Sequence, residues 1–310
     1  MTIQVEQTAS HGWPNCVRLA NDRVELIITT DVGPRIIHFG FVGGENQFAE
    51  FADQLGEVDG DEWRIYGGHR LWHAPEEQPR TYAPDNQPVT LEVYDDMVKL
   101  IQPVESMTGI QKEIDIFLNE RAAVRVVHRL RNRNLWPVEL SVWALSAMAP
   151  GGTAILPLPP RGSHAENLLP TNTLTLWAYT RMNDPRWTWG ERYVLLRHAD
   201  DTWPQKIGAM VPDGWVGFVR NGALFVKAFD VYPSMTYPDL GSAVELFTIN
   251  VMTEVETLSP LYKIVPGGLA VHEERWFLFD DVATPRNDAD VERDIMPRVD
   301  EALMAGEVEP

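Results

Sequence analysis

The chain has 310 residues, and its 26 lysines and arginines against 45 aspartates and glutamates give a formal net charge of −19 at pH 7. Hydrophobic residues at 44%, charged residues at 23% and 11 tryptophans are typical of a well-packed globular protein and exclude a disordered, collagen-like or coiled-coil chain. The acidic balance disfavours nucleic acid and anionic lipid as partners, and the single cysteine, Cys16, cannot form an internal disulfide and favours a reducing compartment.

Two stretches bear on where the chain resides. Residues 1–12 combine Glu6 with polar side chains, whereas a secretory signal needs a basic start followed by an apolar block. Residues 140–160 carry no charge over the length of a membrane span, but Pro150-Gly151-Gly152 in the middle would break a helix. We therefore interpret residues 140–160 as two buried strands around a turn, and we expect a cytoplasmic protein that contacts no membrane.

Short apolar or alternating runs rich in β-branched and aromatic residues predict strands along most of the chain. In chain order these runs are Val24–Thr30, Arg35–Phe41, Val89–Tyr94, Met97–Ile101, Ile110–Leu118, Ala123–Leu130, Val138–Leu145, Leu174–Trp177, Tyr193–Leu196, Trp215–Val219, Leu224–Phe229, Val244–Ile249 and Leu269–Phe279. Clusters of glycine, proline, asparagine and aspartate separate them. Asn221-Gly222, between two such runs, gives the clearest hairpin signal.

Helical spacing occurs over one long stretch, Asp288 to Leu303. An aspartate cap and acidic residues begin it, and apolar residues recur at four-residue steps, while Pro297 inside it predicts a kink or a split into two pieces. The sequence therefore predicts an all-β domain over residues 1–286, with about fourteen or more strands in two large, mainly antiparallel sheets, followed by a C-terminal helical tail over residues 287–310.

Well-known enzyme motifs are missing from the sequence. It contains no phosphate-binding loop, no dinucleotide-binding glycine fingerprint, no His-Glu-x-x-His and no nucleophile elbow. His69 and His73, four residues apart outside any predicted helix, are a weak pattern for metal binding. We therefore expect neither a cofactor nor a metal, and we look for function in polar and aromatic residues of turn-rich segments.

The segment 66–76 offers the mixture of side chains that carbohydrates need. Paired glycines allow a sharp turn, and the residues after them supply a proton carrier, hydrogen-bond donors, a flat apolar face and a carboxylate. These candidate residues are His69, Arg70, Trp72, His73 and Glu76. The alternative interpretation is a packed tryptophan with surface histidines at the corner of a loop.

Two carboxylates in the segment 250–261 form a second candidate. If the segment is extended, Glu254, Glu256 and Leu258 point to one side, whereas Val255 and Thr257 point to the other. Neighbouring like charges raise the pKa of one carboxyl group, as a general base acting near neutral pH requires. The alternative is a pair of solvent-facing acids. A third candidate, Lys112, could bind an anionic sugar or pair with an acid on a solvated face.

The order of these motifs resembles that of a known family. The stretches that carry the likeness, within residues 15–280, are Asn21–Ile36 with the turn at Gly33, Gly67–Glu76, Asn132–Val142, Val255–Pro260, the Pro266-Gly267-Gly268 turn and Trp276–Phe279. In this order they are similar to the galactose mutarotase-like (aldose 1-epimerase) superfamily. The resemblance implies a β-supersandwich fold. It also implies that Glu256 is a general base that takes the proton of an anomeric hydroxyl while an acid protonates the ring oxygen.

One departure from the family concerns that acid. Where the family carries its catalytic histidine, this chain reads Ala144-Leu-Ser-Ala-Met-Ala-Pro150, without histidine. We therefore expect His69 or His73 to act as the general acid, with Arg70, Trp72, Glu76, Lys112 and Glu254 contacting the substrate. General acid–base catalysis contributes about 100-fold to 10,000-fold, so a chain without the acid would be a poor epimerase that still binds sugar.

Three hypotheses follow for a protein whose partner is a small-molecule sugar and whose assembly is a monomer or a homodimer. The first is a cofactor-independent enzyme resembling aldose 1-epimerase. The second is a non-catalytic carbohydrate-binding or sensing protein that holds its ligand with Arg70, Trp72 and Lys112. The third is a glycoside-cleaving enzyme that uses Glu76 and Glu256, which requires carboxyl groups about 5–9.5 Å apart.

Overall fold

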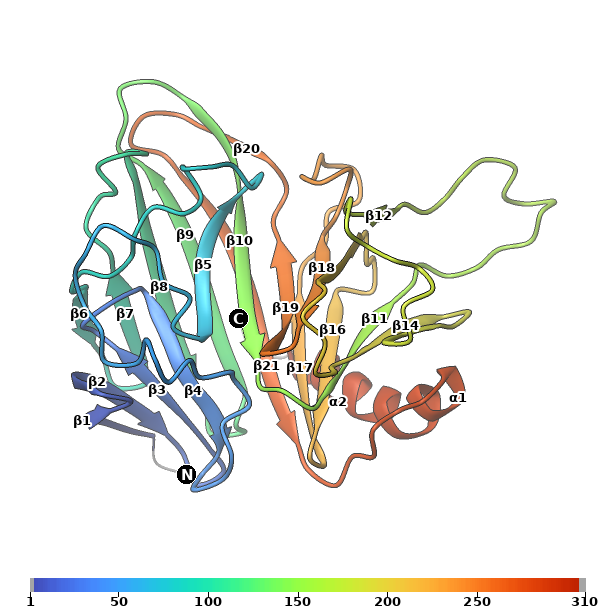
Figure 1. Ribbon diagram of the computed structural model, residues 1–310, viewed down its shortest axis with the longest axis horizontal. Coiled ribbons are helices and arrows are strands. Elements are labelled where there is room, and N and C mark those ends of the chain that lie inside the picture. The colour runs from blue at the N-terminus through green and yellow to red at the C-terminus, as the bar shows by residue number, and fades with distance from the viewer. Residues whose placement is uncertain (1–2, 307–310) are drawn as a thin grey trace.

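The computed structural model describes residues 3–306, which form two large antiparallel sheets packed against each other and a helical segment at the C-terminal end (Figure 1). This confirms the predicted all-β class with two large sheets. Among the described residues, the first sheet has 11 strands and the second has 10.

The first sheet is centred on β10, which connects segments far apart in the sequence. Its strands, in spatial order, are β1 (Gln4–Ser10), β2 (Trp13–Ala20), β3 (Val24–Thr29), β4 (Arg35–Phe41), β5 (Gly68–Ala74), β10 (Val138–Met148), β19 (Met252–Leu258), β18 (Val244–Ile249), β15 (Gln205–Ala209) and β12 (Leu174–Leu176), with β20 (Tyr262–Ile264) paired to β10 off this path. Because β5 and β19 flank β10, the two predicted functional segments lie two strands apart in one sheet.

The second sheet has β13 and β6 as its edge strands. Its strands, in spatial order, are β13 (Trp187–Trp189), β14 (Tyr193–Arg197), β11 (Thr153–Pro157), β16 (Trp215–Arg220), β17 (Ala223–Phe229), β21 (Leu269–Phe279), β9 (Val124–Asn132), β8 (Ile110–Leu118), β7 (Met97–Ile101) and β6 (Thr90–Val93). The core lies between the sheets, where apolar side chains of alternate positions from both sheets meet, such as Leu246, Val255, Phe225 and Trp276.

Two predicted turns are confirmed. β10 and β11 are the two buried strands expected within residues 140–160, and the Pro150–Gly152 turn separates them. Asn221 and Gly222 join β16 to β17, and their φ values of 49° and 80° are those of a primed hairpin turn.

Residues 68–74, expected in a turn-rich segment, instead form the fully buried strand β5. Gly67 and Gly68 introduce it with φ values of 101° and 72°, a conformation that side chains with a Cβ rarely adopt. A Cβ on Gly68 would lie 2.2 Å from the carbonyl oxygen of Ile36 in β4. The glycines therefore allow β5 to approach β4 closely, and they start a strand rather than a loop.

The C-terminal segment is split, as Pro297 predicts. A single turn of helix, α1 (Asp288–Asp290), leads into a π-helical turn (Val291–Ile295) and then into α2 (Met296–Gly306). Pro297 has no amide hydrogen to donate to the preceding turn, which explains the irregular hydrogen bonding there. The cap is Asn287, not an aspartate: its side chain accepts a hydrogen bond from the amide of Asp290.

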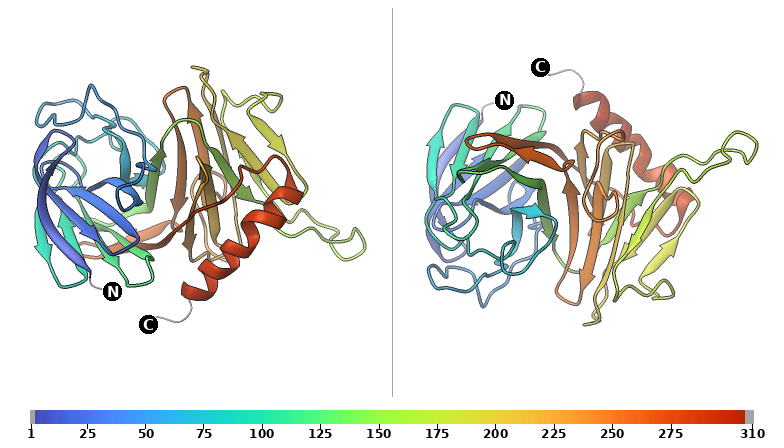
Figure 2. Two further views of the ribbon diagram at one scale, coloured as in Figure 1. Left: turned by 90° about the horizontal axis from the view of Figure 1, so that it is seen from below. Right: turned by 90° about the horizontal axis from the view of Figure 1, so that it is seen from above.

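The helical segment covers the outer face of the second sheet next to β17 and β21 (Figure 2). Val291, Ile295 and Val299, spaced four residues apart as predicted, are buried there against Val226 and Phe277. Within residues 3–306 we find no helix with the length and apolar character that a membrane crossing needs.

Candidate functional site

β5 presents two different sets of side chains to its two faces, because successive residues of a strand alternate. Arg70 and Trp72 point to the outer face of the first sheet, where they contact Glu254 and Trp143. His69 and His73 point the other way, between the sheets. The predicted site residues of this segment are therefore divided between two separate environments.

A cluster of buried charges occupies the outer face. Arg70 Nη1 lies 2.8 Å from Glu254 Oε1, while Lys206 Nζ lies 2.7 Å from Glu245 Oε2 and 3.0 Å from Glu256 Oε2. All five side chains are at most 8% exposed, and Glu256 is 0% exposed. Three carboxylates and two cations thus lie together away from bulk water.

The strand register explains this cluster. Leu145 in β10 pairs with Arg70 on one side and with Glu256 on the other, and Glu256 in turn pairs with Glu245 of β18. As predicted for an extended segment, Glu254 and Glu256 share one face of β19, and Val255 packs in the core between the sheets. Lys206 reaches the carboxylates from β15, beyond β18.

Aromatic rings surround the charges. Trp143 Nε1 donates a hydrogen bond of 2.8 Å to Glu256 Oε2. The Trp72 ring lies 5.4 Å from that of Trp143 and 5.1 Å from those of Trp63 and Tyr82, and the Arg70 guanidinium stacks 4.5 Å above Trp72. Lys206 similarly lies over Trp143 and Trp177. Trp63, Tyr82 and Trp177 come from loops and are half-buried, so they form the outer wall of the cluster.

Burial sets the protonation behaviour of the two central carboxyl groups. Loss of hydration raises the pKa of Glu256; the Lys206 ammonium opposes this rise, and the Glu254 charge adds to it. Burial also raises the pKa of Glu245 well above its usual range, although the Lys206 ammonium acts to lower it. The pKa of Lys206 is itself raised by these two carboxylates despite its burial, so Lys206 stays charged.

Several buried polar atoms in the cluster have no hydrogen-bond partner. They include Glu256 Oε1, Glu245 Oε1, Arg70 Nε, Trp72 Nε1 and Trp63 Nε1. Buried polar groups are almost always hydrogen-bonded in folded proteins. Two acceptors and three donors around aromatic rings therefore fit a ligand that has both hydroxyl groups and apolar faces.

Glu76 lies at the exposed rim of this face, where its carboxylate accepts a hydrogen bond from the Tyr82 hydroxyl. Tyr179, in the segment after β12, is half-buried. Burial raises the pKa of Tyr179; Lys206 opposes this rise, and the charges of Glu256 and Glu76 add to it. Charges of the buried cluster and of the rim residue Glu76 thus both affect the pKa of Tyr179.

The other predicted residues do not reach Glu256, and this corrects the expected meeting of an imidazole with that carboxylate. His69 Nε2 lies 2.7 Å from His128 Nε2 between the sheets, and burial lowers the pKa of His69 well below its usual range. His73 and Lys112 both contact Glu105, at 3.4 Å and 2.6 Å. Lys112 does pair with an acid, but in a buried position and not on a solvated face.

Sequence reasoning missed Lys206, Glu245 and Trp143. A signal existed for Glu245, because it is the one charged residue in the predicted strand Val244–Ile249, at a position that alternates with core residues. Lys206 lies in a short polar strand that had no recognisable pattern.

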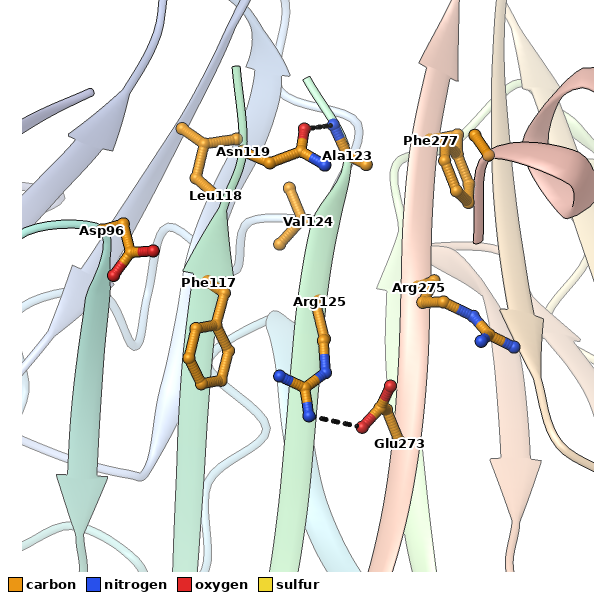
Figure 3. Close-up of a pocket in the computed structure, with 11 residues that line it drawn as sticks. Asp96, Phe117, Leu118, Asn119, Ala123, Val124, Arg125, Glu273, Arg275 and Phe277 are labelled. Atoms are coloured by element: carbon orange, nitrogen blue, oxygen red, sulfur yellow. Dashed lines mark hydrogen bonds and ion pairs between the residues drawn. The ribbon is translucent and has the colours of Figure 1, made fainter. Parts of the chain in front are cut away.

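A separate cavity of about 450 Å³ opens on the outer face of the second sheet, beside the end of α2 (Figure 3). Its two arginines already have partners: Arg125 lies 3.0 Å from Glu273, and Arg275 lies 3.1 Å from Asp230. None of the predicted site residues lines it. The cluster around Glu256 is therefore the better candidate site.

No protein-family model and no curated protein matches this sequence. Solved structures do match it in fold. The Slr1438 protein from Synechocystis sp. PCC 6803 has a TM-score of 0.56 at 10% identity, covering 89% of this chain and 99% of that one. A galactose mutarotase-like protein from Lactobacillus casei ATCC 334 has a TM-score of 0.55 at 10% identity, covering 86% and 100%.

A galactose mutarotase related enzyme from Lactobacillus acidophilus has a TM-score of 0.53 at 10% identity, covering 87% of this chain and 99% of that one. The chain therefore has the fold of the galactose mutarotase-like structures over most of its length, as the motif order suggested. At this level of identity the likeness concerns the fold alone.

Proposed function

We propose that the protein binds a monosaccharide on the outer face of the first sheet and interconverts its anomers, with Glu256 as the general base. The observation that carries the proposal is that the two carboxylate oxygens of Glu256 differ in their contacts. Oε2 is held by Trp143 and Lys206, whereas Oε1 is buried without a partner among aromatic rings. A carboxylate fixed through one oxygen can accept a proton with the other.

The surrounding side chains suit a sugar. The C–H faces of a pyranose pack on aromatic rings, and its hydroxyl groups would satisfy the unpartnered donors of Arg70, Trp72 and Trp63. Glu254 fixes Arg70 in place. Because Trp63 and Tyr82 cover the cluster, the ligand must displace these loop residues to enter.

The reaction would open and close the sugar ring. Glu256 takes the proton of the anomeric hydroxyl, the C1–ring oxygen bond breaks as the carbonyl forms, and the ring oxygen takes a proton from a water molecule. The Lys206 ammonium, 3.0 Å from Glu256, would stabilise negative charge on the ring oxygen. Rotation about the C1–C2 bond and reclosure on the other side of the carbonyl gives the other anomer and restores both protons.

The second candidate is a non-catalytic sugar-binding protein that uses the same residues. His69 and His73 lie on the opposite face of β5, so neither supplies an imidazole acid. The hydroxyl groups of Tyr82 and Tyr179 and the Lys206 ammonium are weaker acids, because the pKa of each is raised above its usual value. This observation favours slow turnover or binding alone.

The test separates the two candidates. Exchange between the anomers of common aldoses is followed by NMR with catalytic amounts of the wild type, of Glu256→Gln and of Glu139→Gln, an exposed glutamate of the same sheet. We expect Glu256→Gln to lose about 100-fold or more of the exchange rate. We expect Glu139→Gln to match the wild type.

Saturable monosaccharide binding by calorimetry without anomer exchange would support the non-catalytic candidate. Exchange that persists unchanged in Glu256→Gln would remove Glu256 as the base. If no monosaccharide binds at millimolar concentration, both candidates fail.

A further inference from the structure

A group of three potential metal ligands lies far from the proposed sugar site, at the turn between β1 and β2. His11, His38 and Glu50 each direct one ligand atom to a common point, and these three atoms lie within 4.8 Å of one another. The residues come from a hairpin turn, from β4 and from the loop after β4, so the chain folds to bring them together.

The distances suit a metal ion better than a direct hydrogen bond. His11 Nε2 lies 3.3 Å from Glu50 Oε1, which is long for a hydrogen bond. Two ligands at about 2.0–2.1 Å from a tetrahedral zinc ion are separated by about 3.3–3.4 Å. His38 Nε2, the third ligand atom, is buried and has no hydrogen-bond partner. It is thus available for a cation at this point.

Other side chains orient the ligands. Ser10 Oγ lies 2.7 Å from His11 Nδ1, which leaves Nε2 of the same ring directed at Glu50. Asn46 donates a hydrogen bond of 2.8 Å to Glu50 Oε1 and is itself held by the amides of Phe39 and Phe48. Metal-binding histidines and carboxylates are usually held by such second contacts.

We propose that His11, His38 and Glu50 bind one divalent transition-metal ion, with Zn²⁺ the best fit to two imidazoles and one carboxylate. All three residues are at least partly accessible, so solvent completes the coordination. The ion fastens the β1–β2 hairpin to β4 at the edge of the first sheet. This site differs from the expectation drawn from the sequence, which was that the chain binds no metal.

A second cluster, His69, His128 and Glu274, also has the right atom types but suits a metal less well. The two imidazole nitrogens are only 2.7 Å apart, which is hydrogen-bond distance. The ammonium of Lys227 lies 2.9 Å from Glu274 and already balances its charge. A divalent ion there would face a buried like charge.

The test uses the full chain stripped with a chelator and titrated with Zn²⁺ by calorimetry, followed by metal analysis after dialysis. We expect one equivalent of zinc and saturable binding, at least tenfold weaker in both His38→Ala and Glu50→Gln. His164→Ala, which removes an exposed loop histidine, is expected to bind zinc as the wild type does. Thermal unfolding with and without zinc shows whether the ion stabilises the fold.

Three outcomes would overturn the proposal. In the first, the wild type binds no zinc at micromolar concentration. In the second, both variants bind zinc as tightly as the wild type, which indicates adventitious binding. In the third, His128→Ala loses the ion while His38→Ala and Glu50→Gln keep it, which assigns it to the cluster between the sheets. Glu50→Gln changes a partly exposed residue, so it tests the site even if His38→Ala fails to fold.

Discussion

Lys206 is the residue on which the charge balance of the candidate site depends. Its ammonium contacts both Glu245 and Glu256, and all three side chains are buried. A buried ion pair adds little net stability, but removing one partner leaves an uncompensated charge, which costs about 3–5 kcal/mol. The Lys206 ammonium therefore supplies the positive charge that allows Glu245 and Glu256 to be buried side by side.

We predict that Lys206→Met lowers the free energy of unfolding by about 3–5 kcal/mol at pH 8, measured by urea denaturation. Without the ammonium, Glu245 and Glu256 take up protons more readily in the folded state than in the unfolded state. Folding is then favoured as the pH falls, so the loss is expected to be smaller at pH 5.

The matched control is Lys99→Met, which breaks a more exposed pair with Glu113 and should cost less than about 1 kcal/mol. An equal loss for Lys206→Met at pH 8 and pH 5 would contradict the charge argument, because lost packing alone does not depend on pH.

At the scale of single elements, strands with apolar alternation could be predicted from the sequence and polar strands could not. β3, β8 and β21 follow predicted runs closely. β1 and β15 escaped prediction because their residues, Gln4–Ser10 and Gln205–Ala209, show no such alternation. Because β15 was not predicted, Lys206 was not predicted as a site residue either, and it is one of the two cations of the site.

β5 shows why the acid was assigned to the wrong side of the sheet. The glycines before it suggest a loop, in which all the following side chains could converge. In a strand, the odd-numbered His69 and His73 must face away from the even-numbered Arg70 and Trp72. The residue types of the site could be predicted from the sequence, but their division between two faces required the strand assignment.

We predict that Gly68→Ala destabilises the protein by about 3 kcal/mol or more, because left-handed backbone strain and steric overlap each cost about 1–3 kcal/mol. The new Cβ would overlap the Ile36 carbonyl, 2.2 Å away, and push β5 from β4. Arg70 and Trp72 would move with β5, so monosaccharide binding should weaken as well.

Gly222→Ala is the matched control for Gly68→Ala. Its φ of 80° is similar, but a methyl group added at this position would meet nothing within 4 Å, so only the backbone strain of about 1–2 kcal/mol remains. Urea denaturation of both variants measures the difference. Equal losses would mean that the approach of β5 to β4 does not depend on glycine.

At the scale of the whole molecule, the two sheets enclose polar groups as well as an apolar core. His69 and His128 contact each other, His272 Nε2 lies 2.7 Å from Thr257 Oγ1, and Lys227 pairs with Glu274. β5 and β19 thus carry site residues on their outer faces and contribute His69 and Thr257 to this inner network. The same two strands couple the candidate site to the packing of the sheets.

The inner histidines are expected to make the fold sensitive to acid. Burial lowers the pKa of His272 from 6.5 to about 3 and that of His128 from 6.5 to about 4. Below pH 6.5 the unfolded chain binds protons that the folded chain does not, so stability is complete above pH 6.5 and is lost as the pH falls toward these lowered values. Each histidine contributes about 1.4 kcal/mol per pH unit across that range.

We predict that His272→Gln, which keeps a polar partner for Thr257, reduces the loss of stability between pH 7 and pH 5 by about 2 kcal/mol relative to the wild type. Urea denaturation at intervals across this range measures it.

The proton uptake of Glu245 and Glu256, whose raised pKa values act in the opposite direction, is common to both proteins and cancels in the comparison. His164→Gln, in an exposed loop, should follow the wild-type profile. Parallel profiles for His272→Gln and the wild type would mean that His272 is not held neutral between the sheets.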